Sequence, residues 1–287
     1  MPVAVDLIVA ILALWALYAL LSTAFSLSFR VGGFFDLSVG ASFLVGAYAT
    51  WCCSRVAPVA VSTACGVVLA GVLAATLGRW LVAPLAVRVS PMALFVATLA
   101  ILYIGQSVAA LAFGTGALVL QSGPAATAEI WPVRVTYVQL LFGAVALAAV
   151  VALRVWLRST PWGRFACAIS DDRSLAGLFG VPVEKAIFRC YWVSGILAGL
   201  AGAYFVADRA VDPSQALTML LSAMVAAIVG GEAILGAVLG ALVLAVMEKT
   251  LGFWLQGNWQ TTVTFAILLS VLIARGGALA QVARRRM

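Results

Sequence analysis

Few side chains in this sequence could carry out chemistry. There is no histidine, which excludes histidine-based metal sites, Ser-His-Asp triads and histidine proton relays. The five cysteines form no CxxC motif and are expected to be small core residues. The chain also lacks a phosphate-binding loop of the Gly-x4-Gly-Lys-Ser/Thr type, so we do not expect it to hydrolyse ATP. The sequence therefore predicts neither an enzyme nor a chain that itself binds a metal or a cofactor.

Two acidic residues lie in otherwise apolar segments and are candidates for a translocation path. The segment "VGGFFDLSVGASFLVGA" (31–47) carries Asp36, and "VGGEAILGAVLGALVLA" (229–245) carries Glu232. An acid in hydrocarbon costs at least ~2.5 kcal/mol on insertion scales, and paired glycine-interrupted segments in two halves of a chain indicate a transport path. The residues predicted to line it are Asp36, Ser38, Gly40, Gly230, Gly231 and Glu232.

The same residues allow a second interpretation. Two short segments of an apolar chain can resemble each other by chance. In that case Asp36 would pair with Arg30 at the membrane interface, and Glu232 would cap the helix that follows it.

The elements that must position these residues are membrane helices. Of the 287 residues, 65% are apolar and 9% are charged, with a mean hydropathy of +1.15, whereas soluble domains average about 45–50% and roughly 25%. We predict one all-α, polytopic membrane domain (1–287) with about eight to nine transmembrane or re-entrant helices. The expected segments are 7–29, 34–53, 58–84, 91–115, 136–157, 190–207, 217–231, 234–250 and 259–274. The pair 217–231 and 234–250 fits either two spans or one re-entrant pair.

The basic residues predict the orientation of the chain and account for its net charge of +7. Lys and Arg gather in cytoplasmic loops, so this charge does not call for a nucleic-acid partner. One predicted side holds Arg30, Arg79, Arg88, Arg154, Arg158, Arg164, Arg173, Lys185, Arg189, Arg275, Arg284, Arg285 and Arg286. The other side holds only Arg55, Arg134, Arg209 and Lys249. We therefore expect the C-terminus in the cytoplasm and the N-terminus outside.

A long polar loop, residues 158–185, interrupts the apolar pattern on the cytoplasmic side. Acidic residues start a short helix there, because they accept free N–H groups and favour the positive end of the helix dipole. Gly180 is expected to end this helix. The residues concerned are Asp171, Asp172, Arg173, Leu175, Leu178 and Phe179, with the three apolar side chains on one face. The helix either lies on lipid or docks a cytoplasmic partner.

On the outer side, polar residues gather in the loops 116–135, 208–216 and 251–258. Arg134, Asp208 and Arg209 could form a landing surface for a partner, although simple solvation explains them equally well. Two glycine pairs with four-residue spacing, Gly195 with Gly199 and Gly236 with Gly240, predict close helix packing, within the subunit rather than between subunits.

Five stretches, in order along nearly the whole chain, carry a family resemblance. They are "YALLSTAFSLSFRVGGFFDLSVGASFLVGAY" (18–48), "LGRWLVAPLAVRVSPMALFVATLAILYIGQSVAALAFG" (77–114), "AGLFGVPVEKAIFRCYWVSGILAGLAGAYF" (176–205), "SAMVAAIVGGEAILGAVLGALVLAVMEK" (222–249) and "TFAILLSVLIARGGAL" (264–279). With these, the sequence resembles the permease subunits of the branched-chain amino acid class of ABC importers. It departs from the family at "DLSVG" (36–40), which is closer to related sugar permeases, and at Glu232, where small residues are usual.

The resemblance implies a transmembrane permease subunit in the bacterial inner membrane. Its expected partners are the lipid bilayer, a second and often different permease subunit, two cytoplasmic ATPase subunits that bind ATP and Mg, and a periplasmic substrate-binding protein. Residues 171–180 would be the helix that couples to an ATPase, and Arg134, Asp208 and Arg209 would face the binding protein. The solute would be an amino acid or a similar small polar molecule. The alternative is an ion- or proton-coupled secondary transporter that uses Asp36 or Glu232.

Overall fold

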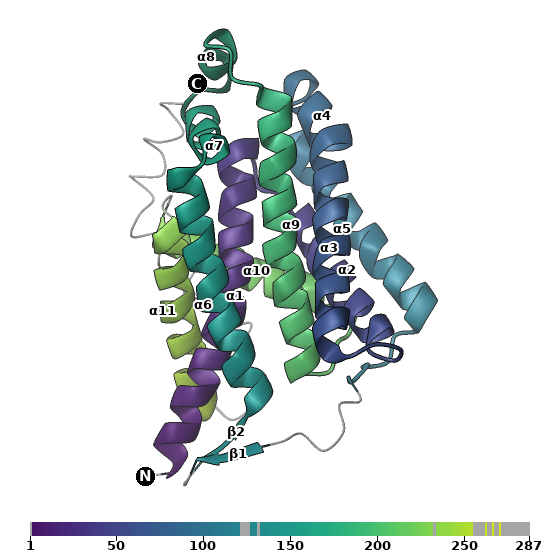
Figure 1. Ribbon diagram of the computed structural model, residues 1–287, viewed down its shortest axis with the longest axis vertical. Coiled ribbons are helices and arrows are strands. Elements are labelled where there is room, and N and C mark those ends of the chain that lie inside the picture. The colour runs from purple at the N-terminus through teal and green to yellow at the C-terminus, as the bar shows by residue number, and fades with distance from the viewer. Residues whose placement is uncertain are drawn as a thin grey trace.

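The computed structural model describes residues 2–120, 127–130, 133–231 and 234–254, together with the isolated positions 262, 266 and 270. Its helices run mostly along the long axis of the molecule (Figure 1). In chain order the elements are α1 (Pro2–Gly32), α2 (Ser38–Cys53), α3 (Val59–Leu77), the π-helical segment η1 (Gly78–Val82), α4 (Ala83–Arg88), α5 (Pro91–Phe113), β1 (Thr127–Ile130), β2 (Val133–Thr136), α6 (Tyr137–Ser159), α7 (Pro161–Asp171), α8 (Arg173–Leu178), α9 (Val183–Asp208), α10 (Gln215–Gly230) and α11 (Ile234–Trp254).

Six of the described helical segments are long and apolar enough to cross a membrane. They are Leu7–Gly32, Val59–Ala86, Pro91–Phe113, Leu141–Ser159, Val183–Asp208 and Ile234–Gly252. Two predicted spans are instead short helices, α2 and α10, of 16 residues each. At 1.5 Å per residue such a helix is about 24 Å long, less than the ~30 Å hydrocarbon core. The predicted segment 259–274 lies outside the described residues, apart from positions 262, 266 and 270.

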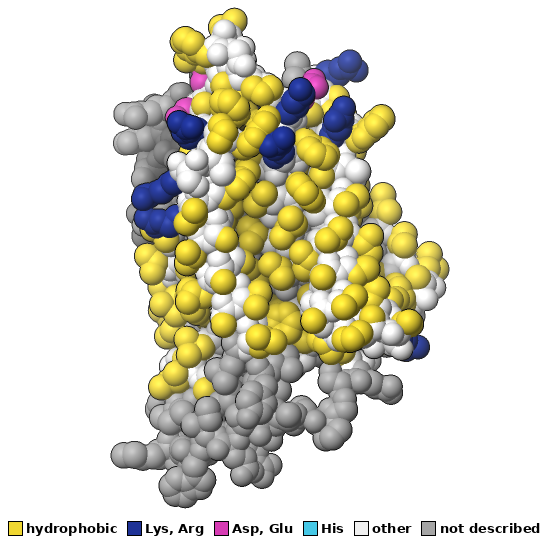
Figure 2. Space-filling model, viewed as in Figure 1, with side chains coloured by type: hydrophobic (Ala, Val, Ile, Leu, Met, Phe, Trp, Pro, Cys, Tyr) yellow, Lys and Arg dark blue, Asp and Glu magenta, His cyan; other side chains and the backbone are white. Residues whose placement is uncertain are grey.

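Helices α1 and α9 form the centre of the bundle. They are the most buried of the six long segments, and α5 and α6 are the most exposed. Helix α9 packs on α2, α3 and α1, while α1 also contacts α10 and α11. The apolar side chains on the outside of the bundle, shown in yellow in Figure 2, are what a lipid-facing surface requires.

Glycines set how closely α9 approaches its neighbours. A Cβ on Gly195 would lie 2.7 Å from the Ala70 carbonyl oxygen, and one on Gly202 would overlap the Phe43 carbonyl oxygen. A Cβ on Gly199 would lie 2.6 Å from the Ala70 side chain. The predicted role of Gly195 and Gly199 in packing within the subunit is therefore confirmed.

The structure adds a short hairpin that the sequence did not predict. Strands β1 and β2 pair antiparallel, with Glu129 opposite Arg134 and Thr127 opposite Thr136. The hairpin precedes α6 at the end of the molecule that holds the start of α1 (Figure 1). It occupies part of the predicted outer loop 116–135.

Candidate functional site: two helix breaks and an exposed short helix

The break between α1 and α2 lies inside the bundle. Helix α1 ends where Gly33 adopts φ +75°, a conformation that favours glycine. The Leu37 N–H group, just before α2, donates to the Thr98 hydroxyl at 3.3 Å. Thr98 lies seven residues into α5, about 10 Å from the start of that helix. Helix α2 therefore begins inside the bundle, about two helical turns beyond the start of α5.

Asp36 is fully buried in this break. One carboxylate oxygen accepts the Ser38 N–H at 2.9 Å and the Ser38 hydroxyl at 2.6 Å, so Asp36 holds the first turn of α2. The hydroxyls of Ser28 and Tyr191 lie near the carboxyl group. Its second oxygen has no hydrogen-bond partner among the described residues.

The expected ion pair between Asp36 and Arg30 is not formed in the described structure. The Arg30 Nε atom is buried and lacks a hydrogen-bond partner there. The reason is local, because one carboxylate oxygen of Asp36 already accepts two hydrogen bonds from Ser38, two residues away.

The second break joins α10 to α11. Helix α10 ends at Gly230, and Gly231 follows with φ +81°. A Cβ on Gly230 would overlap the Gly236 carbonyl oxygen, and one on Gly240 would overlap that of Ala226. Only glycine permits this approach, as the Gly236 and Gly240 spacing predicted. Glu232 lies outside the described residues.

Helix α11 turns back after the break that ends α10. Near its start, α11 accepts a hydrogen bond at the Ala237 carbonyl from Ser22, which lies well inside α1, at 3.3 Å. Near its end, Glu248 lies close to Arg209, in the loop that leads into α10. Helix α11 thus returns toward the end of the molecule from which α10 starts.

The residues predicted to line the path meet only in part. Gly40 on α2 faces Leu220 on α10 and Leu102 on α5, which brings the two short helices together. Ser38 is 2% exposed, and Gly230 and Gly231 are half-buried. Their lining of a path stays a prediction.

The predicted cytoplasmic helix is present as α8. Asp172 caps α8 by accepting hydrogen bonds from the N–H groups of Ser174 and Leu175 at 2.9 and 3.0 Å. Gly180, with φ +81°, follows the end of the helix. The Leu175 N–H and then the Ser174 hydroxyl hold the pKa of the Asp172 carboxyl below its usual value. The sequence prediction of this cap and this stop is confirmed.

Helix α8 turns its large apolar side chains away from the protein. Leu178 is 85% exposed and Phe179 81%, while the small Ala176 is buried. Arg173 donates from its guanidinium to the Ala83 carbonyl at 3.4 Å, which ties α8 to α4. Figure 1 shows α8 standing beyond α7 and the start of α9 at the end of the molecule.

The sequence did not separate α7 from α8. Thr160 caps α7 by accepting the Gly163 N–H at 3.2 Å, and Pro161 follows as its first residue. The "TPWG" stretch carries this signal, because a capping hydroxyl followed by proline is typical of a helix start. Asp171 is the last residue of α7 rather than part of the α8 cap.

The end of the molecule that carries α7 and α8 is also basic. Figure 2 shows Lys and Arg side chains gathered there, over the ends of the long helices. Arg88 ends α4, Arg158 lies at the end of α6, and Lys185 lies at the start of α9. This distribution is the one on which the predicted orientation depends.

At the opposite end, two of the predicted outer loops meet. Leu118 and Val211 exchange backbone hydrogen bonds of 2.9 and 2.8 Å. Arg209 forms an ion pair with Asp208 at 3.2 Å, so both lie in the same patch. The backbone of Arg134 lies in β2, and its side chain is outside the described residues.

One buried acidic residue was not predicted from the sequence. Glu248 on α11 is 4% exposed and accepts the hydroxyl of Tyr18 on α1, with distances of 2.9 and 3.2 Å to its two oxygens. Arg209 and Lys249 lie nearby. In the sequence, Glu248 lies near the end of an apolar run, which is typical of a residue at the membrane interface. Its partner Tyr18 is apparent only from the packing of α1 on α11.

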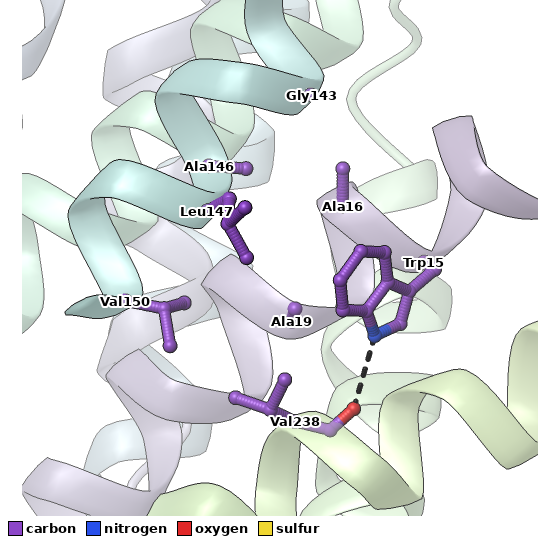
Figure 3. A pocket seen from close by; sticks show the side chains of 8 residues that line it. All are labelled: Trp15, Ala16, Ala19, Gly143, Ala146, Leu147, Val150 and Val238. Carbon is purple, nitrogen blue, oxygen red and sulfur yellow. Dashed lines mark hydrogen bonds between the residues drawn. The ribbon is translucent and has the colours of Figure 1, made fainter.

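An apolar pocket opens between α1, α6 and α11 (Figure 3). Its lining residues are Trp15, Ala16, Ala19, Gly143, Ala146, Leu147, Val150 and Val238. The Trp15 indole N–H donates to the Val238 carbonyl at 3.0 Å and is therefore satisfied. The pocket lining is almost entirely hydrocarbon surface.

The arrangement of six long apolar helices, two short ones and an exposed helix at the basic end fits a family of transport proteins. A family model described as branched-chain amino acid transport system / permease component matches residues 7–272. The chain belongs to this family. Family membership favours the importer over the secondary transporter that was the alternative.

Individual relatives differ in the solute that their names state. A probable ABC transporter permease, y4mJ of Sinorhizobium fredii, is 32% identical over 135 residues, covering 44% of this chain and 40% of the relative. The high-affinity branched-chain amino acid permease LivH of Salmonella typhimurium is 28% identical over 149 residues, covering 51% and 48%. The fructose import permease FruG of Bifidobacterium longum is 32% identical over 148 residues, covering 46% and 44%. The chain thus spans less than half the length of these relatives, and no solved structure matches it.

Proposed function

We propose that this permease forms the solute path of an ATP-driven, binding-protein-dependent importer in the bacterial inner membrane. The proposed assembly holds a second permease subunit, a different sister chain, along with two ATPase subunits that bind ATP and Mg and a periplasmic binding protein. The proposed solute is an amino acid or a similar small polar molecule. Relatives named for amino acids and for fructose support a small polar solute in general.

Exposed helix α8 carries this proposal. A chain that only spans a membrane does not require a capped helix of six residues whose last residue, Leu178, and the residue after it, Phe179, are both more than 80% exposed. Apolar anchors on a short helix fit a hydrophobic groove on a partner. Because α8 lies beyond the ends of the long helices and is tied to α4 through Arg173, movement of the partner would reach the membrane helices.

The proposed path runs beside α2 and the α10–α11 pair. Both begin or end at a break inside the bundle, where backbone groups are tolerated only if protein or water satisfies them. Asp36 and Glu232 would give the path a mildly anionic wall, which favours neutral, zwitterionic or cationic solutes over free anions. In the competing interpretation Asp36 is purely structural, and its hydrogen bonds to Ser38 suit that role too.

The outer patch is the proposed contact for the binding protein. Arg209 is already paired with Asp208 and lies near Glu248, so its reversal would disturb the fold as well as the surface. Arg134 is therefore the better residue for a charge reversal. The reversal should mainly lower the rate at which the binding protein associates, and this effect should weaken as the salt concentration rises.

The experiment on α8 compares Phe179→Ala with Trp80→Ala. Trp80 is a second exposed aromatic residue, 78% exposed on η1, and lies outside α8. If the Phe179 side chain has about 150 Å² to bury, covering its exposed 81% at ~25 cal/mol per Å² stabilises the complex by up to ~3 kcal/mol.

We therefore expect Phe179→Ala to weaken ATPase binding by about 30- to 150-fold. Trp80→Ala should leave ATPase binding unchanged. The measurement is the Kd of the detergent-solubilised permease for its ATPase, with helical content as a folding control. Equal affinities of wild type and Phe179→Ala would remove the docking role of α8.

A further inference from the structure

Two cysteines meet where α2 and α3 join. The Sγ atoms of Cys53, the last residue of α2, and Cys65, in the second turn of α3, lie 3.4 Å apart. Both residues are partly buried. Neighbouring Cys52 is exposed, Cys167 is exposed on α7, and Cys190 is buried in α9. The structure describes all five cysteines, and this is the one pair whose sulfurs it places in contact.

The backbone holds these two thiols together without help from the sulfurs. Gly66, next to Cys65, faces the Gly46 carbonyl, where a Cβ would come within 2.6 Å, and this close approach draws α2 and α3 together. The turn that joins the two helices is closed by N–H groups of Val56 and Ala57, which donate to the Cys53 carbonyl at 3.0 and 2.9 Å. The pair is thus preorganised, and the 3.4 Å between the two sulfurs would shorten to the ~2.05 Å of an S–S bond on oxidation.

We propose that Cys53 and Cys65 form a disulfide that fixes the outer end of α2 to α3. This rests on the proposed function and on the orientation predicted from the basic residues, which together place the α2–α3 turn and Arg55 in the periplasm, an oxidising compartment. The disulfide would leave the inner end of α2, at the Asp36 break, as the end that is free to move.

The reaction is a thiol–disulfide exchange with a periplasmic oxidoreductase that carries a disulfide. One cysteine thiolate attacks that disulfide and forms a mixed disulfide, and the second thiolate then displaces the oxidoreductase. The two cysteines lose two protons and two electrons, and the oxidoreductase takes up both as its dithiol. No other oxidant is required.

Counting free thiols tests the disulfide. Membranes are quenched in acid, and the unreduced, denatured full-length chain is alkylated with a polyethylene glycol maleimide that shifts the band once per thiol. We expect three free thiols in the wild type before reduction and five after it. Cys53→Ser should show four in both conditions, and the matched Cys52→Ser control should show two and then four.

Two results would overturn the inference. Five free thiols in the unreduced wild type would show that no disulfide forms. Four in unreduced Cys52→Ser would show that Cys52, not Cys53, is a partner.

A second measurement separates this inference from the orientation. A variant that keeps only Cys65 is treated in intact spheroplasts with a maleimide that cannot cross the membrane. Labelling of Cys65 together with five free thiols in the wild type refutes the disulfide and leaves the orientation standing. Labelling only after lysis refutes the proposed orientation and the disulfide with it.

Discussion

The contact between Tyr18 and Glu248 gives a quantitative test of how α1 holds α11. Tyr18 is 0% exposed and Glu248 4%, so water does not replace the bond when the hydroxyl is removed. Hydrogen bonds to charged groups contribute about 1.5–3 kcal/mol in soluble proteins, but polar contacts in membrane bundles average ~0.6 and reach ~1.7 kcal/mol. Because the acceptor is a buried carboxyl group in a membrane bundle, we expect Tyr18→Phe to cost about 1–1.7 kcal/mol.

The assay is a double-mutant cycle on the free energy of unfolding. Tyr18→Phe, Glu248→Met and the double variant are unfolded reversibly in mixed micelles, with helical circular dichroism as the signal. Methionine has similar length and lacks the carboxylate, so Tyr18→Phe should cost much less in that background. Tyr103→Phe, on a tyrosine of α5 that is 50% exposed, is the control and should stay within about 0.5 kcal/mol of wild type.

Two outcomes would refute this reasoning. In the first, Tyr18→Phe is no more costly than Tyr103→Phe. In the second, Tyr18→Phe costs as much free energy in the Glu248→Met background as it does when the glutamate is present. Either result would mean that the hydrogen bond does not stabilise the packing of α1 on α11.

Two further predictions concern the other packed and capped elements. Gly240→Ala should destabilise the protein by about 1–3 kcal/mol in the same unfolding assay, because its Cβ would overlap the Ala226 carbonyl. Gly143→Ala is the control and should not destabilise the protein, because its Cβ meets open space. Equal effects of the two substitutions would contradict the packing role of Gly240. Asp172→Ala should speed amide hydrogen exchange in α8. Because the pKa of Asp172 is lowered in the folded protein, its cap should be complete above the ordinary aspartate pKa range. In the wild type the cap should be lost as the pH falls through that lowered pKa. Exchange in α8 that changes neither with the substitution nor with acid would contradict the capping role.

Local patterns predicted much of this fold. Long apolar runs gave α1, α5 and α9, because each covers a membrane thickness with few charges. The Asp172 cap and the Gly180 stop of α8 were also predictable, since both act within a few residues. The hairpin β1–β2 was not predicted, because eight strand residues in a polar loop give only a weak sequence pattern.

Contacts between segments that are distant in the chain could not be predicted from the sequence. Arg30 is the basic residue nearest to Asp36 in the sequence, but in the structure the donors to Asp36 belong to Ser38. Distance along the chain does not show which of the two residues is the partner. Glu248 and Tyr18 are separated by 230 residues, so their bond appears only once α11 packs on α1. The contact between Cys53 and Cys65 depends in the same way on the close approach of α2 to α3.

Docking of α8 on an ATPase is tested by identifying what contacts α8 in the assembled transporter. A photo-crosslinking amino acid is placed at position 179 or, as the control, at position 56, where Val56 is 93% exposed in the turn between α2 and α3. After irradiation in native membranes, the captured proteins are identified by mass spectrometry. We expect position 179 to capture an ATPase subunit and position 56 not to capture one. Capture of the ATPase at position 56, or of lipid alone at position 179, would contradict the docking of α8 on an ATPase.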